Sequence, residues 1–160
     1  MVAATAPTLR APLYTEEERR RRDQTPWTLV QGVLAPVQFL AFVVSLGLVI
    51  RALVSGDGHQ AATISIVVKT GLLYAIMVTG AIWEKEVFGR YLFAPAFFWE
   101  DVVSMLVLAL HTAFLVAVWG DHLGRDGRLA LALVAYFTYV VNAAQFVIKL
   151  RRARLDRSLA

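Results

Sequence analysis

Four long apolar runs, separated by short polar segments, dominate the pattern of the chain. They cover roughly residues 27–54, 61–83, 102–120 and 129–150. A hydrocarbon core of about 30 Å is crossed by about 20 helical residues at ~1.5 Å per residue, so each run can span a membrane. The pattern predicts an all-α polytopic membrane protein, with a four-helix transmembrane bundle as the domain 27–150.

Two polar regions flank this domain. Residues 1–26 form an N-terminal tail without the apolar segment of a cleavable signal peptide, and we expect residues 1–13 to be disordered. The stretch TEEERRRRD, with a capping box from Thr15 to Glu18, predicts a short amphipathic helix. Thr25 and Pro26 suit the N-cap and first turn of the first span. Residues 151–160 form a basic C-terminal tail.

Composition and charge placement extend this picture. Of 160 residues, 58% are hydrophobic, which is unusual for a soluble domain. Twelve of the sixteen Lys and Arg residues lie before the first run, between the second and third runs, or from Lys149 at the end of the last run onward. The positive-inside rule therefore places both termini and the segment 83–101 in the cytoplasm. We expect these basic residues to contact anionic lipid headgroups rather than nucleic acid. The absence of cysteine excludes disulfides and thiolate sites.

Three spans carry polar stripes at helical spacing. Their members are Gln31, Gln38 and Ser45; Glu100, Ser104 and His111; and Thr138, Asn142, Gln145 and Lys149. Such residues either hold a bundle together by interhelical hydrogen bonds or line a pocket. The depth shared by Gln31, Asn142 and Gln145 favours a pocket. His111 is a structural group, a proton relay or an axial ligand of a metallated tetrapyrrole. Lys69 is expected to snorkel out to the opposite membrane surface.

The segment WEKEVFGRYLFAPAFFWED, residues 83–101, concentrates acids and rings between two spans. Its carboxyl groups are Glu84, Glu86, Glu100 and Asp101, and its rings include Trp83, Phe97, Phe98 and Trp99. Burial against rings would raise the pKa of a carboxyl group toward the range of a general acid. Glu86 has Arg90 four residues on, which predicts a helical ion pair. The alternative for the whole segment is an aromatic belt at headgroup level with ordinary flanking charges.

The segment also carries a family resemblance. It is part of the block SIVVKTGLLYAIMVTGAIWEKEVFGRYLFAPAFFWEDVVSMLVLALHTAFL (65–115). Together with TPWTLVQGVLAPVQFLAF (25–42) and AYFTYVVNAAQFVIKLR (135–151), this block resembles the 3-vinyl bacteriochlorophyllide hydratases of bacteriochlorophyll biosynthesis, also called chlorophyllide a hydratases. The similarity runs from about Leu13 to Arg154. It implies a hydro-lyase that adds water to the C3 vinyl group of a magnesium chlorin, giving a 1-hydroxyethyl group.

The resemblance also implies a setting and a site. The location would be a bacterial inner membrane, cytoplasmic or intracytoplasmic photosynthetic, with other enzymes of the pathway as partners. The protein would need no cofactor of its own, because magnesium arrives in the substrate. We expect residues 83–101 to form the cytoplasmic mouth of a chlorin pocket. The catalytic candidates are Glu100, Asp101 and Glu84, with Glu100 favoured as general acid beside a desolvating Trp99. The substrate-binding candidates are His111, Gln31, Asn142, Gln145, Trp83, Trp99 and Phe98, with His111 or its water on the magnesium.

Two other classes of protein fit parts of the pattern. A non-catalytic pigment carrier, or an assembly subunit of a photosynthetic complex, would use the same pocket and His111 but would not need the acids. A small quinone-binding subunit would use the histidine but leave the carboxyl groups unexplained. The sequence does not separate chlorophyllide a from its bacteriochlorin analogues as the preferred substrate.

Overall fold

The described part of the chain is entirely helical. In residues 12–158, which the computed structural model describes, there are five α-helices and no strands. They are α1 (Glu16–Gln24), α2 (Pro26–Ser55), α3 (His59–Phe88), α4 (Phe98–Trp119) and α5 (Arg125–Ser158). The four long helices are apolar enough to cross a membrane, so the predicted all-α, multi-pass architecture is confirmed. Arg10 and most of the tail that we expect to be disordered lie outside the described residues.

The starts of α1 and α2 follow the predicted capping chemistry. The Glu18 N–H donates to Thr15 Oγ1 over 3.2 Å, and the Thr15 N–H donates to Glu18 Oε2 over 2.8 Å. This reciprocal pair is the predicted capping box. Thr25 caps α2 by accepting from the Trp27 N–H, and Pro26 occupies the first helical position, where a missing N–H costs nothing.

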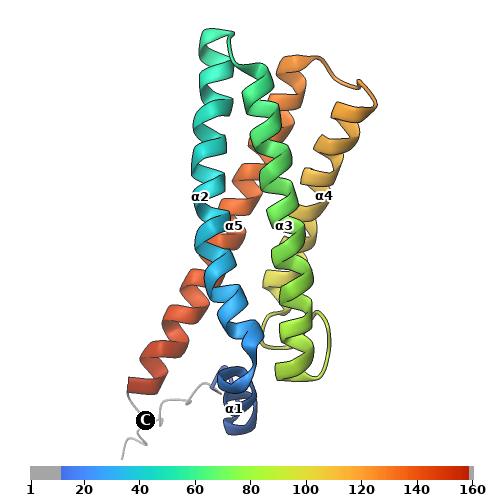
Figure 1. Ribbon diagram of the computed structural model, residues 1–160. Coiled ribbons are helices and arrows are strands. Elements are labelled where there is room, and N and C mark those ends of the chain that lie inside the picture. The colour runs from blue at the N-terminus through green and yellow to red at the C-terminus, as the bar shows by residue number, and fades with distance from the viewer. Residues whose placement is uncertain (1–11, 159–160) are drawn as a thin grey trace, which may run out of the picture.

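The four long helices form two antiparallel hairpins (Figure 1). In the first hairpin, α2 packs along α3, and the turn between them uses Gly56 and Gly58, both with positive φ. In the second hairpin, α4 packs along α5. Both short turns lie at the upper end of the bundle in Figure 1, and the connection between hairpins lies at the lower end. Most contacts between helices are made within a hairpin, so the seam between the hairpins is the weaker boundary.

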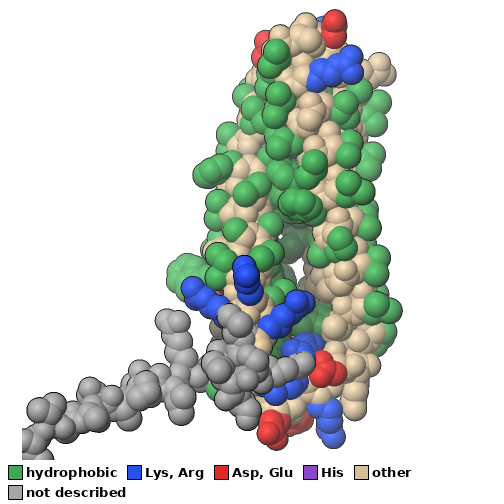
Figure 2. Space-filling model, turned by 90° about the vertical axis from the view of Figure 1, so that its left-hand side faces the viewer, with side chains coloured by type: hydrophobic (Ala, Val, Ile, Leu, Met, Phe, Trp, Pro, Cys, Tyr) green, Lys and Arg blue, Asp and Glu red, His purple; other side chains and the backbone are tan. Residues whose placement is uncertain are grey.

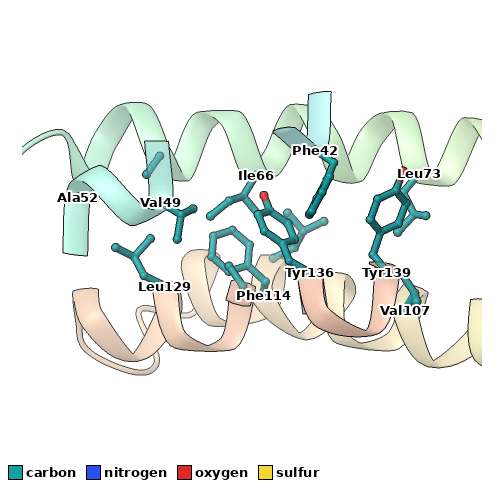
Figure 3. Close-up of a cluster of buried hydrophobic side chains, with 13 residues drawn as sticks. Phe42, Val49, Ala52, Ile66, Leu73, Val107, Phe114, Leu129, Tyr136 and Tyr139 are labelled. Carbon is teal, nitrogen blue, oxygen red and sulfur yellow. The ribbon is translucent and has the colours of Figure 1, made fainter. Parts of the chain in front are cut away.

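A buried apolar cluster joins the hairpins (Figure 3). It draws on all four long helices, with Phe42, Ile66, Val107, Phe114 and Tyr136 among its members. Since lipid tails are as apolar as these side chains, close van der Waals packing rather than exclusion of water stabilises the contact. The outward faces carry many exposed aliphatic side chains, as expected of a lipid-facing surface. Figure 2 shows apolar side chains over the body of one face and Lys and Arg gathered toward its lower end.

The helices are longer than a membrane is thick. At ~1.5 Å per residue, the 30 residues of α3 measure about 45 Å, against a hydrocarbon core of about 30 Å. The helix α5 continues to Ser158, through most of the region that the sequence pattern assigns to a separate basic tail. The last turns of α3 and α5 can therefore place their polar side chains beyond the apolar core.

Candidate active site

The connection 89–97 turns the chain back into the bundle at the lower end. The helix α3 ends at Phe88 and is capped by Gly89, whose φ of 82° suits a residue without a side chain. The Phe97 N–H then donates to the Ala94 carbonyl over 2.8 Å, and α4 begins at the next residue. Between these points Phe93 adopts a φ of 58°, which is uncommon for a residue with a side chain. The result is that the N–H groups of Phe93 and Ala94 point at buried carboxyl groups.

Those two carboxyl groups form a buried pair between α3 and α4. Asp101 accepts from the Phe93 N–H over 2.7 Å, and Glu84 accepts from the Ala94 N–H over 3.2 Å. Both side chains are buried, and the two carboxyl groups are close enough to interact with each other. Two negative charges in contact and shielded from water repel strongly, so such a pair holds one proton between its members. We call Glu84 and Asp101 the carboxyl pair.

Glu100, next to the pair, has a different environment. Lys149 on α5 forms an ion pair with it and also donates to the Ala96 carbonyl. The Lys149 ammonium lies 5.0 Å from the centre of the Phe97 ring. Glu100 is therefore the ion-paired acid of the site. Lys149, which belongs to the polar stripe of the last span, is the partner that the local sequence around Glu100 did not reveal.

Trp99 does not desolvate Glu100, so that part of the prediction is wrong. The Trp99 side chain is 69% exposed, whereas Glu100 is buried. Successive residues of a helix point about 100° apart, because 3.6 residues make one turn, and Trp99 faces away from the bundle. Phe98 is also exposed and packs edge-on against Trp99. The structure therefore places Trp99 and Phe98 on the outer surface, as the aromatic-belt alternative expects, and not beside the buried acids.

The predicted ion pair between Glu86 and Arg90 is also wrong. Glu86 accepts hydrogen bonds from the Thr25 hydroxyl and from Trp27 Nε1 at the start of α2. The helix ends at Phe88 with Gly89 as its C-cap, so Arg90 does not occupy the next turn of α3 and cannot follow the helical spacing. Within the described residues no ion pair joins it to Glu86. Glu86 instead ties the end of α3 to the start of α2.

A cluster of rings lies at the same end of the bundle as the buried acids. The Phe97 ring packs against Trp83 and Phe88 and stacks on Phe146 of α5. Trp83 Nε1 donates to the Thr28 hydroxyl over 2.9 Å, which fixes the indole. Tyr14 completes the cluster from the segment before α1. Sequence reasoning missed Phe146 and Tyr14. Phe146 lies one residue from Gln145 on the stripe, whereas Tyr14 stands outside every apolar run and gave no signal.

The predicted amide residues fall into two groups. Gln31 donates to the Thr79 hydroxyl over 2.7 Å, and Asn142 donates to the Glu100 carbonyl over 2.9 Å while accepting from Ser104. These two hold helices together, as the alternative reading of the stripes allows. Gln145 differs, because its buried Oε1 has no hydrogen-bond partner among the described residues. The same holds for both polar atoms of Gln38.

His111 lies away from the acids, in the middle of the bundle. It is eleven residues from Glu100 along α4, or about 16 Å. Its Nδ1 donates to the Val107 carbonyl over 2.8 Å, and its Nε2 lies 3.0 Å from the Nζ of Lys69. Both ring nitrogens are therefore engaged in a fully buried side chain. This arrangement gives no support to magnesium ligation by His111, which stays a prediction.

Lys69 does not snorkel to the membrane surface, so that prediction is wrong. Its side chain is fully buried, and its Nζ lies 4.2 Å from the centre of the Tyr139 ring. Inside the bundle the ammonium contacts the imidazole acceptor of His111 and the ring faces of Tyr136 and Tyr139, which stabilise it there. Within the described residues, no three His, Asp or Glu side chains cluster in a way that could hold a metal ion.

Comparisons with known proteins identify relatives over nearly the whole chain. The family model described as 2-vinyl bacteriochlorophyllide hydratase (BCHF) matches residues 14–152. A 2-vinyl bacteriochlorophyllide hydratase of Rhodobacter capsulatus is 66% identical over 149 residues, covering 92% of this chain and 85% of the relative. The protein of the same name from Cereibacter sphaeroides is 64% identical over 149 residues, covering 92% of each chain. No solved structure matches the chain significantly.

Proposed function

The chain belongs to the 2-vinyl bacteriochlorophyllide hydratase family, and we propose that the acids at the lower end of its bundle carry out the hydration. The protein is a hydro-lyase that adds water to the vinyl group of a (bacterio)chlorophyllide in bacteriochlorophyll biosynthesis. The vinyl position numbered 2 in the family name is C3 in systematic tetrapyrrole numbering. The resemblance found from the sequence is thus confirmed.

The direction of addition sets what the site must supply. A proton goes to the terminal vinyl carbon, because the resulting cation is conjugated with the macrocycle. Water then bonds to the adjacent carbon and loses a proton, which gives the 1-hydroxyethyl group. The minimal machinery is an acid near the terminal carbon and a base near the attacking water.

The carboxyl pair suits the acid, and Glu100 suits the base. Glu84 and Asp101 hold one proton in a buried setting, and that proton moves to the terminal carbon. Glu100, ion-paired with Lys149, accepts the proton that the water loses. Return of that proton from Glu100 to the carboxyl pair restores the site, so the sum is one water added. The observation that carries this assignment is the buried carboxyl pair beside an ion-paired carboxylate. In this assignment Glu100 is the base, whereas the sequence analysis favoured it as the general acid.

The surrounding residues suit a flat substrate. Trp83, Phe97 and Phe146 offer ring faces and edges next to the acids. Gln145 offers an unpaired oxygen at the same depth, while Gln31 and Asn142 keep the walls in place. Addition of water transfers no electrons, so we propose that the protein uses no cofactor of its own and that the magnesium is the one in the substrate.

The setting proposed for the protein is a bacterial inner membrane, cytoplasmic or intracytoplasmic photosynthetic, with both termini in the cytoplasm. The four apolar helices make it a multi-pass membrane protein. Support for the orientation comes from the Lys and Arg side chains gathered toward the lower end (Figure 2). These side chains would contact anionic headgroups, and neighbouring enzymes of the pathway would take up the polar product.

The test is direct conversion by the purified protein. The protein in lipid nanodiscs is incubated with chlorophyllide a, and the absorption shift on loss of the vinyl group is followed, with the gain of one water checked by mass. An analogue that carries an ethyl group in place of the vinyl group should stay unchanged. Tight binding of chlorophyllide without conversion, by protein that remains folded, would support the pigment-carrier alternative instead.

A further inference from the structure

Gln38 is a buried residue of α2 whose two side-chain polar atoms both lack a hydrogen-bond partner in the described part of the chain. Its side chain is 3% exposed, and among residues 12–158 neither its Oε1 nor its Nε2 has a hydrogen-bond partner. Leaving a buried amide unpaired costs about 1–3 kcal/mol for each polar group. A leucine of similar size would avoid that cost, so the amide at this position points to a ligand.

The helix geometry shows where the amide faces. Ser45, seven residues on and therefore on nearly the same face of α2, contacts Ser65 of α3 and Tyr136 of α5. Phe42, one turn from Gln38, packs on Tyr139 with ring centroids 5.0 Å apart. Gln38 therefore faces the seam between the two hairpins, just below the level where α2 and α5 meet. Figure 2 shows a narrow hollow between the two columns of helices, in the lower half of the face that it displays.

The distance from Gln38 to the acids suits a chlorin. Gln31 is seven residues below Gln38 on α2 and bonds Thr79, and Glu84 is five residues further down α3. The two steps sum to about 18 Å between the Cα atoms along the bundle. Side chains lean toward the N-terminus of their own helix, so those of Gln38 and Glu84 lean toward each other and leave a gap on the order of 10 Å. A macrocycle whose centre lies near Gln38 would place a peripheral vinyl group near the carboxyl pair.

The chemistry of the two unpaired atoms of Gln38 indicates which part of the substrate they contact. The polar groups at the edge of a chlorophyllide are keto, ester and carboxylate oxygens, which are hydrogen-bond acceptors. They can pair with the Nε2 of Gln38 but not with its Oε1. The electrophile of the substrate is its magnesium, a hard cation that prefers oxygen ligands. A neutral amide oxygen suits it, and His111 has both nitrogens engaged elsewhere.

We propose that the Oε1 of Gln38 is the axial ligand of the substrate magnesium, and that this contact sets the depth of the macrocycle in the seam. The inference rests on the proposed function for the identity of the substrate. It adds Gln38, which lies outside the predicted site, to the substrate-binding residues, and it explains why an amide occupies this position. The planar ligand enters where the hairpins are least joined, and the Gln38 contact fixes it with the vinyl group at the acids.

The test compares binding of chlorophyllide a with binding of its metal-free form, pheophorbide a. Both are titrated into the full-length protein in nanodiscs, as wild type, Gln38→Leu, Gln38→His and Ser45→Ala. Gln38→Leu should weaken chlorophyllide binding about tenfold or more and change pheophorbide binding less than twofold. Gln38→His should restore chlorophyllide affinity and shift the absorption bands that report axial coordination. Ser45→Ala, on the same face but bonded within the bundle, should not discriminate between the ligands.

Other outcomes would overturn the assignment. They are an equal effect of Gln38→Leu on both ligands, no effect on either, or a wild-type protein that does not prefer the magnesium form. A structural amide would show as lower thermal stability of ligand-free Gln38→Leu with the magnesium preference intact, which also overturns it. Failure of the hydratase assay itself, with magnesium-selective loss in Gln38→Leu, would refute the proposed function and leave the magnesium contact standing.

Discussion

Replacing Glu84 by glutamine separates proton donation from every other role of this side chain. The new amide has nearly the same shape, so its oxygen can still accept from the Ala94 N–H and its NH₂ can donate to the Asp101 carboxylate. The helix ends and the connection 89–97 should therefore keep their positions. What the variant lacks is the proton that the carboxyl pair transfers to carbon.

The expected size follows from that single loss. Removing a general acid typically lowers a rate by about 10² to 10⁴, which corresponds to about 3–5 kcal/mol in the activation free energy. Stability should not fall, because the substitution removes one of two carboxyl groups that compete for a proton. We expect a hydration rate at least 100-fold below wild type, an unchanged dissociation constant for chlorophyllide and an equal or higher unfolding temperature.

The assay is the absorption-monitored hydration in nanodiscs, with binding measured separately. Glu86→Gln is the matched control, because it makes the same chemical change on the same helix at a group that bonds Thr25 and Trp27. It should stay within about twofold of wild type, as expected for a residue away from the reacting atoms. If Glu84→Gln retains more than a tenth of the wild-type rate while folded and substrate-bound, the carboxyl pair is not the acid and the assignment fails.

Three further predictions concern stability and topology. Lys149→Met should leave the Glu100 carboxylate buried without its ion-pair partner and lower the free energy of unfolding by about 2 kcal/mol. Thermal denaturation in detergent measures this loss, and an unchanged midpoint would contradict the pairing. Phe97→Ala should lower the free energy of unfolding by about 3–5 kcal/mol, because the ring is buried among other rings. Trp99→Ala, on the exposed surface, should lower it by less than about 1 kcal/mol in the same assay, and similar losses would refute the assigned orientations. Reporter fusions in the turn 56–58 and at the C-terminus should give opposite signals, and equal signals would rule out the four-span topology.

The helices were predictable because their signals are local. Run length and apolar content marked the four spans, and the Thr15 capping box and Pro26 marked two helix starts. Each of these features depends on residues within a few positions of one another. The lengths of α3 and α5 went beyond the apolar runs, because helices continue into water as long as backbone hydrogen bonds and polar side chains permit.

The site was predictable only in part, because its pairings are tertiary. The sequence located the acids at one depth, but it could not show that Glu100 meets Lys149, 49 residues away. Nor could it show that Lys69 finds His111 inside the bundle, since the distance to the membrane surface alone suggested snorkelling. The prediction that Trp99 desolvates Glu100 failed for a simpler reason. Neighbours in sequence on a helix face different directions, so adjacency to Glu100 did not mean contact.

The link between Lys69 and His111 bears on how the protein is made. Two other polar side chains of the first hairpin pair within it, Gln31 with Thr79 and Ser45 with Ser65. The partner of Lys69 is His111 on α4, which is synthesised 42 residues later. Until then its ammonium faces lipid, at about 2.5–3.5 kcal/mol on insertion scales. The nascent first hairpin is thus held near the translocon or exposed to membrane proteases until the second arrives. Expressed alone it should be degraded, and co-expression of the second hairpin as a separate chain should protect it.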